Sequence, residues 1–341
     1  MYYIRSVEQN DLEDLFSLSQ HLAFINLPPN KRMLRNKIQS SLKAFNGPEE
    51  NLVDDYFIFV LIDSEKDKLI GVSMIHGKHG TEKEPHFYLT VGQEKKYSQS
   101  INTGFIHGTL KLGIETDGWT EIGGLILSPD YRGNPNKLGK QLSFCRFLYM
   151  SGHEKKFTPV IHSELMPPLD EKGNSPLWEA IGRRFMNMNY QEADKLSREN
   201  KEFILSLFPQ GTIYEALLTP EARDSIGRVG RETEPVKNML ESVGFNFTNE
   251  VDPFDGGPHY RGVLSDLKPI RTAFSGNLQT TKELNGEISN IIIELNHKTN
   301  PFYALAVKAI IDGDQIFIDQ DTYDKIDFGN LKNTECRGIF F

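Results

Sequence analysis

The stretch LILSPDYRGNPNKLGKQL, residues 125–142, decides the fold, because it joins an apolar strand to a helix through a basic turn. The turn and the helix start carry Arg132, Lys137 and Lys140, although the whole chain has a formal net charge of −9. In a loop and in the first turn of a helix, backbone N–H groups point outward unpaired, and the helix dipole makes that end positive. The stretch therefore predicts a binding site for an anion.

A second interpretation of the same turn is also open. Gly133, Asn134 and Pro135 are common turn residues, and on this interpretation the neighbouring cations are solvated surface groups. The residues of the turn alone do not separate an anion site from ordinary turn chemistry.

The size and composition of the chain limit its class. Its 341 residues are more than one compact core usually fills, so two or three packed units are expected. With 38% hydrophobic and 25% charged residues, the chain is typical of a soluble globular protein. The longest apolar run, YFIFVLI at 56–62, is strand-sized and far below the roughly 20 residues that span a bilayer. No membrane association is predicted.

Charge and cysteine content favour a cytoplasmic protein that acts on a small molecule. Arg5, Glu8 and Asp11 lie where a secretory signal would need its apolar region. Cys145 and Cys336 are the only cysteines, too few for a disulfide framework and consistent with a reducing compartment. The acidic balance disfavours nucleic acid, which is bound through cationic contacts to phosphate, and is compatible with a cationic small substrate.

The order of strand and helix signals predicts an α/β fold of the mixed kind. Residues 1–190 alternate the two patterns, residues 191–270 are mostly helical, and residues 271–341 carry strand-like runs. We therefore expect a mixed sheet flanked by helices in 1–190 and a helical extension with the FDGGP loop in 191–270. A small β-rich subdomain is expected in 271–341.

Local signals predict individual elements. Asp11 is placed as the N-cap of a first helix, and Ser175 followed by Pro176 marks the start of another. The runs 56–62 and 69–75 flank the polar SEKDK and predict a hairpin.

Two segments are not assigned to a helix or strand. Residues 76–118 are rich in His, Gly and Thr and carry no clear period. The segment DPFDGGPHY, residues 252–260, is a loop by composition.

The opening stretch resembles the pyrophosphate loop of the GCN5-related N-acetyltransferase superfamily. The resemblance rests on Leu-x-Leu-x-Pro-x-Tyr-Arg-Gly followed by Leu-Gly-Lys at a helix start, although NPNK lengthens the turn. It implies that the helix N-terminus holds the coenzyme A pyrophosphate, and that the preceding strand pairs with the pantetheine arm.

The chain from residue 1 to roughly 270 resembles the arginine N-succinyltransferase family. The segments that carry the resemblance, in order, are SPLWEAIGRRF at 175–185, Ala193-Asp194 with Leu196, Ile213-Tyr214, SIGRV at 225–229, MLESVGF at 239–245 and FDGGP at 254–258. Their order and spacing together make the resemblance specific. It implies an enzyme that moves a succinyl group from succinyl-CoA to the α-amine of arginine.

The same resemblance implies a set of coenzyme-binding residues. The family's succinyl-CoA contact on the strand before the loop falls on Leu125, which is unchanged. With it the resemblance implies Leu127, Arg132, Gly133, Lys137, Leu138, Gly139 and Lys140.

Two departures from the family concern the acceptor and the chemistry. The family's proposed proton donor is a His in Ile-Gly-x-Val-His-Pro, whereas this chain reads IGRVGR and has Gly230 at that position. The family's Gly-Leu-Thr-x-Leu-Pro is also altered, to AFINLP at 23–28. Coenzyme use is therefore carried over more firmly than arginine specificity.

Glu164 is the candidate base for acyl transfer. An α-amine has a pKa of about 8 in peptides, so near neutrality a base or a water chain must take its proton. Glu164 lies near the end of the strand after the coenzyme helix, where the superfamily opens its sheet around the acceptor, and it aligns with a family Glu. Its alternative role is an exposed carboxylate or a structural ion pair.

His259 and Asp255 are further candidates in and after the FDGGP loop. His259 could supply the missing imidazole, or it is a loop residue with no task. Asp255 could bind a guanidinium as a bidentate partner, or its side chain bonds its own backbone in a turn. His76, His79 and His86 have no specific metal-binding spacing, so no metal site is predicted.

Three functions remain open on the sequence. The first is an acyltransferase that uses succinyl-CoA as co-substrate and arginine or a related basic amino acid as acceptor. The second is an acyltransferase that uses acetyl-CoA or another acyl-CoA with a different amine. The third is an inactive CoA-binding subunit of a hetero-oligomer, since paired related subunits occur in this family; a homo-oligomer is also open.

Overall fold

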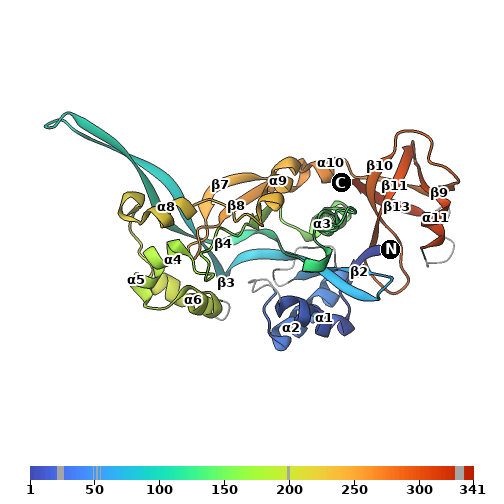
Figure 1. Cartoon of the computed structure of the whole chain (residues 1–341), viewed down its shortest axis with the longest axis horizontal. Helices are drawn as coiled ribbons and strands as arrows, with labels where there is room; N and C mark the ends of the chain where they lie inside the picture. Colours follow the sequence, from blue (N-terminus) through green and yellow to red (C-terminus); the bar gives the residue numbers. More distant parts are fainter. Residues whose placement is uncertain (21–26, 49, 51–52, 54, 198–199, 327–333) are drawn as a thin grey trace. The chain divides into compact units, whose positions relative to one another are not determined.

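The structure, a computed structural model, describes residues 1–341 except for 21–26, 49, 51–52, 54, 198–199 and 327–333. Residues 23–26 of the altered segment AFINLP therefore lie outside the described part. Contacts divide the chain into two compact units (Figure 1). Unit 1 comprises 1–78, 120–159 and 264–341, and unit 2 comprises 79–119 and 160–263. This division follows contacts; the predicted boundaries at 190 and 270 follow changes in sequence pattern and stay a prediction.

Unit 1 contains a sheet covered by helices on both faces. Its elements are β1 (Tyr2–Ser6), α1 (Leu12–Gln20), α2 (Lys31–Asn46), β2 (Tyr56–Asp63), the first part of β3 (Lys68–Ser98), the last part of β4 (Thr103–Leu127) and α3 (Leu138–Gly152). The predicted hairpin is confirmed, because β2 pairs antiparallel with β3. Ile58 and Val60 of β2 pack against α1 and α2, whereas Phe57 and Phe59 on the opposite face contact Tyr149 of α3. Both faces of β2 are thus buried, which explains its unbroken apolar run.

The C-terminal part of unit 1 is a small β-structure, as predicted. After α10 (Lys268–Arg271) come β9 (Phe274–Thr281), β10 (Ser289–Glu294), β11 (Tyr303–Asp312), β12 (Gln315–Asp319), α11 (Gln320–Asp324) and β13 (Glu335–Phe340). Their pairings run β10–β13–β9–β12–β11 and return from β11 to β10, which closes a ring of five strands. Closing a sheet removes its open edges. β11 also pairs with β1 through Ile4 opposite Ala304, so this ring continues the sheet of unit 1.

Unit 2 combines a strongly bent set of strands with short helices. Its elements are the remainder of β3 and β4, β5 (Val160–Glu164), α4 (Pro176–Ala180), α5 (Gly182–Met186), α6 (Tyr190–Ser197), α7 (Glu202–Leu207), β6 (Ile213–Tyr214), α8 (Pro220–Ser225), α9 (Glu234–Val243), β7 (Asn246–Val251) and β8 (Pro258–Val263). β7 and β8 lie within the predicted helical extension 191–270.

The core of unit 2 is built around Trp178. Ser175 caps α4, because its hydroxyl accepts the N–H of Trp178 at 3.0 Å, and Pro176 occupies the first helical position. This confirms the predicted helix start. Trp178 is 1% exposed and stacks on Phe254, with ring centroids 4.9 Å apart. The start signal in the sequence therefore positions the largest buried side chain of the unit.

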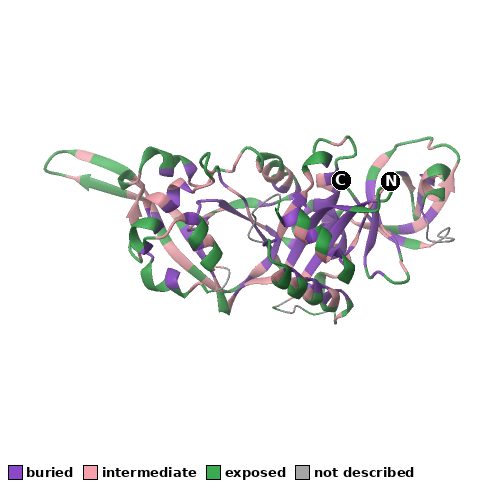
Figure 2. Cartoon of the chain, turned by 60° about the horizontal axis from the view of Figure 1, so that its bottom comes forward, coloured by how far each residue is buried: buried purple, intermediate pink, exposed green. Residues whose placement is uncertain are grey.

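The segment 76–118, which the sequence left unassigned, belongs to two long strands. β3 and β4 pair with each other and form a hairpin whose far end is exposed (Figure 2). Tyr97, Ile101 and Phe105 near its tip are 60–68% exposed. Because these two strands pair with each other, backbone hydrogen bonds form without the regular alternation of burial that reveals a strand in a sequence.

The predicted N-cap at Asp11 is wrong. Asp11 is the last residue of a short 3₁₀ turn, Gln9–Asp11, that precedes α1. Its carboxylate accepts the backbone N–H of Glu8 at 2.6 Å and pairs with the guanidinium of Arg5 at 2.7 Å. The carboxylate therefore reaches back to close the turn and hold β1, instead of capping the following helix.

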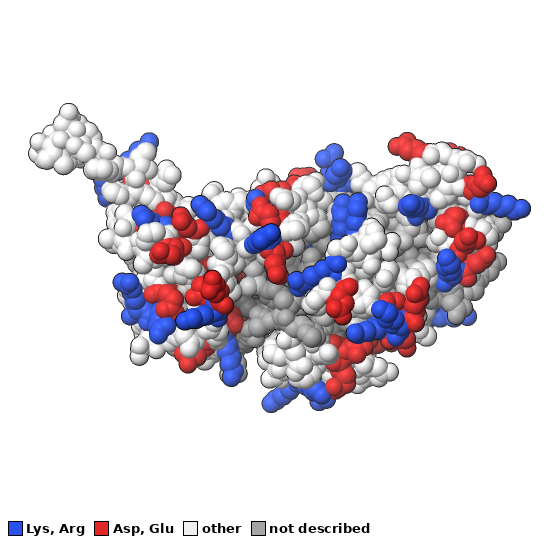
Figure 3. Space-filling model, in the orientation of Figure 1, with Lys and Arg blue, Asp and Glu red and all other residues white. Residues whose placement is uncertain are grey.

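Among the described residues, no helix combines the length and the apolar character that crossing a lipid bilayer requires. On the face drawn in Figure 3, the visible Lys and Arg side chains are interspersed with Asp and Glu side chains. That face therefore carries mixed charge, in agreement with the acidic composition of the chain.

Candidate functional site

Unit 1 carries the predicted anion site at the start of α3. Tyr131 fixes the turn through its buried ring and its hydroxyl group. The hydroxyl donates a hydrogen bond to Asp63 at 2.8 Å and accepts one from Lys66 at 3.1 Å. Gly133 then takes a left-handed conformation with φ of 70°, and Lys137 does so with φ of 54°. Residues other than glycine rarely adopt a positive φ. The rest of the turn therefore holds Lys137 in a backbone conformation that is locally unfavourable in energy.

The first turn of α3 offers backbone donors. In the described part of the chain, the N–H groups of Leu138 and Gly139 donate no hydrogen bond, and no side chain caps the helix. A Cβ added at Gly139 would meet no atom within 4 Å, so the space in front of this turn is open. Lys140 lies beside it, and burial together with Lys137 and Lys268 lowers the pKa of Lys140. The geometry is that of a helix end ready for an anion.

The strand before this turn, β4, contains one glycine in a left-handed conformation. Gly124 has φ of 57°, in the left-handed region that favours glycine, directly before Leu125. Ile126 is buried, whereas Leu125 and Leu127 on either side are partly exposed. The two predicted leucines therefore share the accessible side of β4, while Ile126 anchors the strand in the core.

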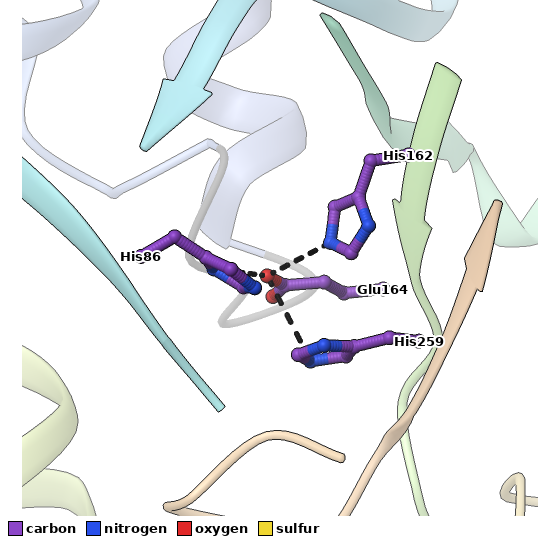
Figure 4. Close-up of side chains that lie close together, drawn as sticks. All are labelled: His86, His162, Glu164 and His259. Atoms are coloured by element: carbon purple, nitrogen blue, oxygen red, sulfur yellow. Dashed lines mark hydrogen bonds and ion pairs between the residues drawn. The ribbon is translucent and has the colours of Figure 1, made fainter. Parts of the chain in front are cut away.

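Unit 2 carries a second candidate site, which forms where β5 and β8 pair. The strands are antiparallel, with Glu164 opposite His259 and His162 opposite Arg261. Directly opposed residues lie on the same face of a sheet, and residues two apart in a strand do too. Glu164, His162 and His259 therefore share one face, and His86 of β3 joins them. We call these four residues the histidine cluster (Figure 4).

The rings of the cluster surround one carboxylate oxygen. Glu164 Oε1 lies 3.4 Å from His86 Nδ1, 3.4 Å from His162 Nε2 and 3.9 Å from His259 Nε2. The dashed lines in Figure 4 mark these contacts. His79 Nε2 is 3.5 Å from the same oxygen and 2.8 Å from His86 Nδ1.

Burial separates the carboxylate from the rings. The side chains of His86, His162 and His259 are 2%, 0% and 0% exposed, whereas that of Glu164 is 26% exposed. A molecule in solvent can therefore reach Glu164 while the imidazoles lie behind it.

The imidazoles are neutral at physiological pH. Burial lowers the pKa of His79 to about 3 and lowers the pKa values of His86, His162 and His259 well below the usual value, and neighbouring cations and rings act in the same direction. A ring kept neutral cannot form an ion pair, so their contacts with Glu164 are those of a carboxylate with uncharged rings.

Several ring nitrogens have no partner in the described part of the chain. His86 Nε2 and both ring nitrogens of His259 are buried there without a hydrogen bond. A buried polar atom left unpaired costs about 1–3 kcal/mol, so such atoms are uncommon in folded proteins. The cluster therefore has binding capacity that contacts within the chain do not use.

Arg261 fixes the ring of His162. Its Nε donates to His162 Nδ1 at 3.3 Å, and its guanidinium lies 3.3 Å from the centroid of the Trp119 ring and pairs with Glu250. Because His162 Nδ1 accepts this bond, the proton of the neutral ring is on Nε2, where it faces Glu164.

The FDGGP loop places Asp255 in a tight turn. Asp255 Oδ1 accepts the N–H of Gly257 at 2.8 Å, and Tyr190 donates to Oδ2 at 3.4 Å. Gly256 has φ of 81°, and a Cβ at Gly257 would lie 2.3 Å from the carbonyl oxygen of Leu165. Burial, with Asp252 beside it, raises the pKa of Asp255 well above its usual value. The bond to Gly257 matches the turn interpretation; guanidinium binding by Asp255 stays a prediction.

The composition of residues 252–260 predicts that His259 lies in a loop, and this prediction is wrong. The loop ends at Gly257, and β8 begins at Pro258 because residues 258–263 pair with β5 and β7. Pairing with strands that are distant in sequence decides the conformation here, and the Gly-rich composition reaches only as far as the turn.

Gly230 occupies a crowded position. Its N–H donates to the carbonyl oxygen of Met166 at 2.8 Å, and a Cβ there would lie 3.0 Å from the carbonyl oxygen of Pro167. A side chain at this position requires the backbone at Pro167 to move. At the position where the family has His, this chain therefore has a glycine that lies close to the backbone of Met166 and Pro167.

In this mixed sheet, β4 leads through a basic turn into the open N-terminus of α3. This is the fold of the GCN5-related acyltransferases, a class that uses a coenzyme A thioester. The chain belongs to the arginine N-succinyltransferase family, since the family model described as "Arginine N-succinyltransferase beta subunit" matches residues 2–269. The resemblance from residue 1 to roughly 270 is thereby confirmed.

Individual relatives agree with this assignment. The chain is 35% identical over 274 residues to an arginine N-succinyltransferase of Yersinia pseudotuberculosis, covering 80% of this chain and 77% of that protein. It is 34% identical over 274 residues to the enzyme of Shigella dysenteriae, covering 80% and 78%. The solved structure of the arginine/ornithine succinyltransferase subunit AI from Pseudomonas aeruginosa has a TM-score of 0.85 at 23% identity, covering 100% of this chain and 98% of that chain. The predicted fold class is thereby confirmed.

Proposed function

We propose that this chain transfers the succinyl group of succinyl-CoA to the α-amino group of arginine or a related basic amino acid. The observation that carries the proposal is the family match over residues 2–269, which includes both the loop before α3 and the strand that bears Glu164. An acetyl-CoA enzyme and an inactive CoA-binding subunit are less well supported, because the relatives are named arginine N-succinyltransferases.

Coenzyme binding is assigned to the turn and first helical turn of unit 1. The open N–H groups of Leu138 and Gly139 would donate hydrogen bonds to the pyrophosphate, and Arg132, Lys137 and Lys140 would supply positive charge. Gly133 allows the turn, and the partly exposed Leu125 and Leu127 face the pantetheine arm. The absence of a side chain at Gly139 lets the phosphate approach the backbone closely.

Chemistry is assigned to Glu164. The amine nitrogen of the acceptor attacks the thioester carbonyl, its proton passes to Glu164 directly or through one water, the C–S bond breaks, and the coenzyme leaves as a thiolate. Glu164 is the accessible member of its group, at 26% exposure. His259 is fully buried, so we propose that it acts by positioning Glu164, with its Nε2 at 3.9 Å from Oε1.

Asp255 and the two cysteines bear on the substrate and on the cellular compartment. Asp255 remains the candidate for the guanidinium of the acceptor, with the restriction that one of its oxygens accepts a bond from Gly257. A reducing cytoplasmic setting is supported by Cys145 and Cys336, which are both buried and unbridged.

The test is turnover by the purified chain alone. Succinyl-, acetyl- and glutaryl-CoA are each combined with arginine, ornithine and lysine, and release of the coenzyme thiol is followed over time. We expect steady release, fastest with succinyl-CoA and arginine. Preference for another acyl-CoA would replace the proposed substrate, and coenzyme binding without turnover would identify a binding-only subunit.

A further inference from the structure

The histidine cluster has the spacing of a metal site. In a tetrahedral zinc site with bonds of about 2.0–2.1 Å, neighbouring ligand atoms lie roughly 3.3–3.4 Å apart. Glu164 Oε1 is 3.4 Å from His86 Nδ1, 3.4 Å from His162 Nε2 and 3.9 Å from His259 Nε2. One ligand atom from each of the four residues lies within 4.8 Å of every other.

The chemical state of these ligands also fits a metal ion. A metal ion binds the neutral imidazole through the lone pair of one ring nitrogen. Nε2 of His259, the atom that lies 3.9 Å from Glu164 Oε1, is buried without a hydrogen bond in the described part of the chain. Three imidazoles and one carboxylate converge at this point, and a cation there would use the lone pair of His259 Nε2 that contacts within the described residues leave unused.

We propose that His86, His162, His259 and Glu164 bind one divalent transition-metal ion. Three imidazole nitrogens suit Zn²⁺ and disfavour Mg²⁺ and Ca²⁺, which prefer oxygen, and one carboxylate is a common fourth ligand of Zn²⁺. This ligand set comes from β3, β5 and β8, all within unit 2, so it is formed inside one compact unit.

Binding requires two present contacts to change. The proton that His162 carries on Nε2 would move to Nδ1, so the bond from Arg261 at 3.3 Å would open. Arg261 would keep its pair with Glu250 and its place over Trp119. The 2.8 Å contact of His79 Nε2 with His86 Nδ1 would be replaced in the same way, with His79 left as a neighbour of the bound ring.

Metal binding would be a property separate from acyl transfer, but it would affect the transfer. A carboxylate bound to Zn²⁺ through Oε1 is a much weaker base toward the acceptor amine. If Glu164 is the base, the metal-bound chain is inactive, and added Zn²⁺ inhibits transfer reversibly. Metal binding itself is measured without substrates, so failure of one proposal does not imply failure of the other.

The experiment uses the full chain, freed of metal with a chelator and dialysed. Zn²⁺ is titrated by calorimetry, and Co²⁺ is titrated by visible absorption, because a tetrahedral cobalt site absorbs strongly. We expect one ion per chain. The His86→Ala/His259→Ala double variant and Glu164→Gln should each bind at least 100-fold more weakly, whereas His107→Ala, which removes a histidine of unit 2 outside the cluster, should bind as before.

Several results would overturn the proposal. They are the absence of a stoichiometric site, binding that both variants retain, and binding that His107→Ala abolishes. Glu164→Gln preserves the size of the side chain, so it decides the question even if the double variant does not fold. Circular dichroism confirms that each variant used is folded.

Discussion

The turn and helix start at residues 132–140 of unit 1, which we call the anion loop, and the histidine cluster of unit 2 are proposed to bind in opposite ways. The loop presents backbone N–H groups, and a Cβ at Gly139 would meet open space. In the cluster, side chains from three strands converge, with the three imidazoles buried and Glu164 partly exposed. The first arrangement suits a large anionic ligand that must enter and leave, and the second suits proton transfer or a small ion. Changes in the loop should therefore alter affinity, and changes in the cluster should alter chemistry.

The largest expected effect is on the chemistry of the cluster. Glu164→Gln keeps the shape and removes the charge, so kcat should fall by roughly 10²- to 10⁴-fold. Affinity for coenzyme A, measured by calorimetry, should stay near its original value. Glu179→Gln, which changes an exposed carboxylate paired with Arg183, is the matched control and should keep full activity.

The comparison would break if Glu164→Gln kept more than about half the activity. Glu164 would then be structural, and His259 would be the next residue to replace. A simultaneous loss of coenzyme affinity would also contradict the separation of binding from chemistry.

The half-buried carboxyl of Glu294, outside both regions, tests how partial burial changes the pKa of a carboxyl. Burial raises the pKa of Glu294 from 4.5 to about 7, although Arg337, whose Nη1 lies 3.5 Å from Oε2, acts in the opposite direction. The folded state therefore binds the proton more tightly than the unfolded state. Stability that is present below about pH 4.5 is lost as pH rises toward 7, by about 3 kcal/mol.

Urea denaturation between pH 5 and pH 8 checks this prediction. Glu294→Gln should flatten the decline in unfolding free energy, and Glu335→Gln, exposed on β13, should leave it unchanged. A decline that persists in Glu294→Gln would assign the pH dependence to other groups.

The next effect concerns coenzyme affinity at the loop. Gly139→Leu should weaken coenzyme A binding at least tenfold, because the side chain fills the space that the pyrophosphate needs. The melting temperature should not change, since a Cβ at Gly139 meets no atom within 4 Å. Gly211→Leu is the control, because its Cβ also meets open space and the residue is not part of the loop. Unchanged affinity in Gly139→Leu would reject the anion site.

The smallest effect is expected at Gly230. Gly230→His should not be needed for turnover, and it should lower stability by about 1–2 kcal/mol, because its Cβ approaches the carbonyl oxygen of Pro167 at 3.0 Å. Gly230→Ala separates the cost of the Cβ from that of the ring. Turnover that occurs only in Gly230→His would mean that the natural chain is an inactive subunit.

Local signals predicted much of the fold. Ser175 and Pro176 start α4 as expected, and the hairpin of β2 with β3 forms around the polar SEKDK. Each of these signals acts over a few residues, through a cap, a fixed φ or a turn. Asp11 is an exception. Its carboxylate accepts hydrogen bonds from the backbone N–H of Glu8 and from Arg5, which precede it, and does not cap the helix that follows.

Within the histidine cluster, the sequence predicts roles for Glu164 and His259 but does not group them with His86 and His162. No metal-binding spacing along the chain includes His86, because its neighbours in the cluster are distant in sequence. The one available signal was alternation, since His162 and Glu164 are two residues apart in a predicted strand and must share a face. The register of β5 with β8 that brings His259 opposite Glu164 is set by distant pairing.

The sequence by itself determined the family, the strand, turn and helix at 125–142, and the apolar runs of the core, because these depend on residues adjacent in the chain. Only the tertiary structure decided that four histidines surround one carboxylate, that Gly230 lies against the backbone of Pro167, and that the C-terminal strands close into a ring. The physical reason is that strand register and close backbone contact are fixed by packing between distant segments, and no local pattern encodes them.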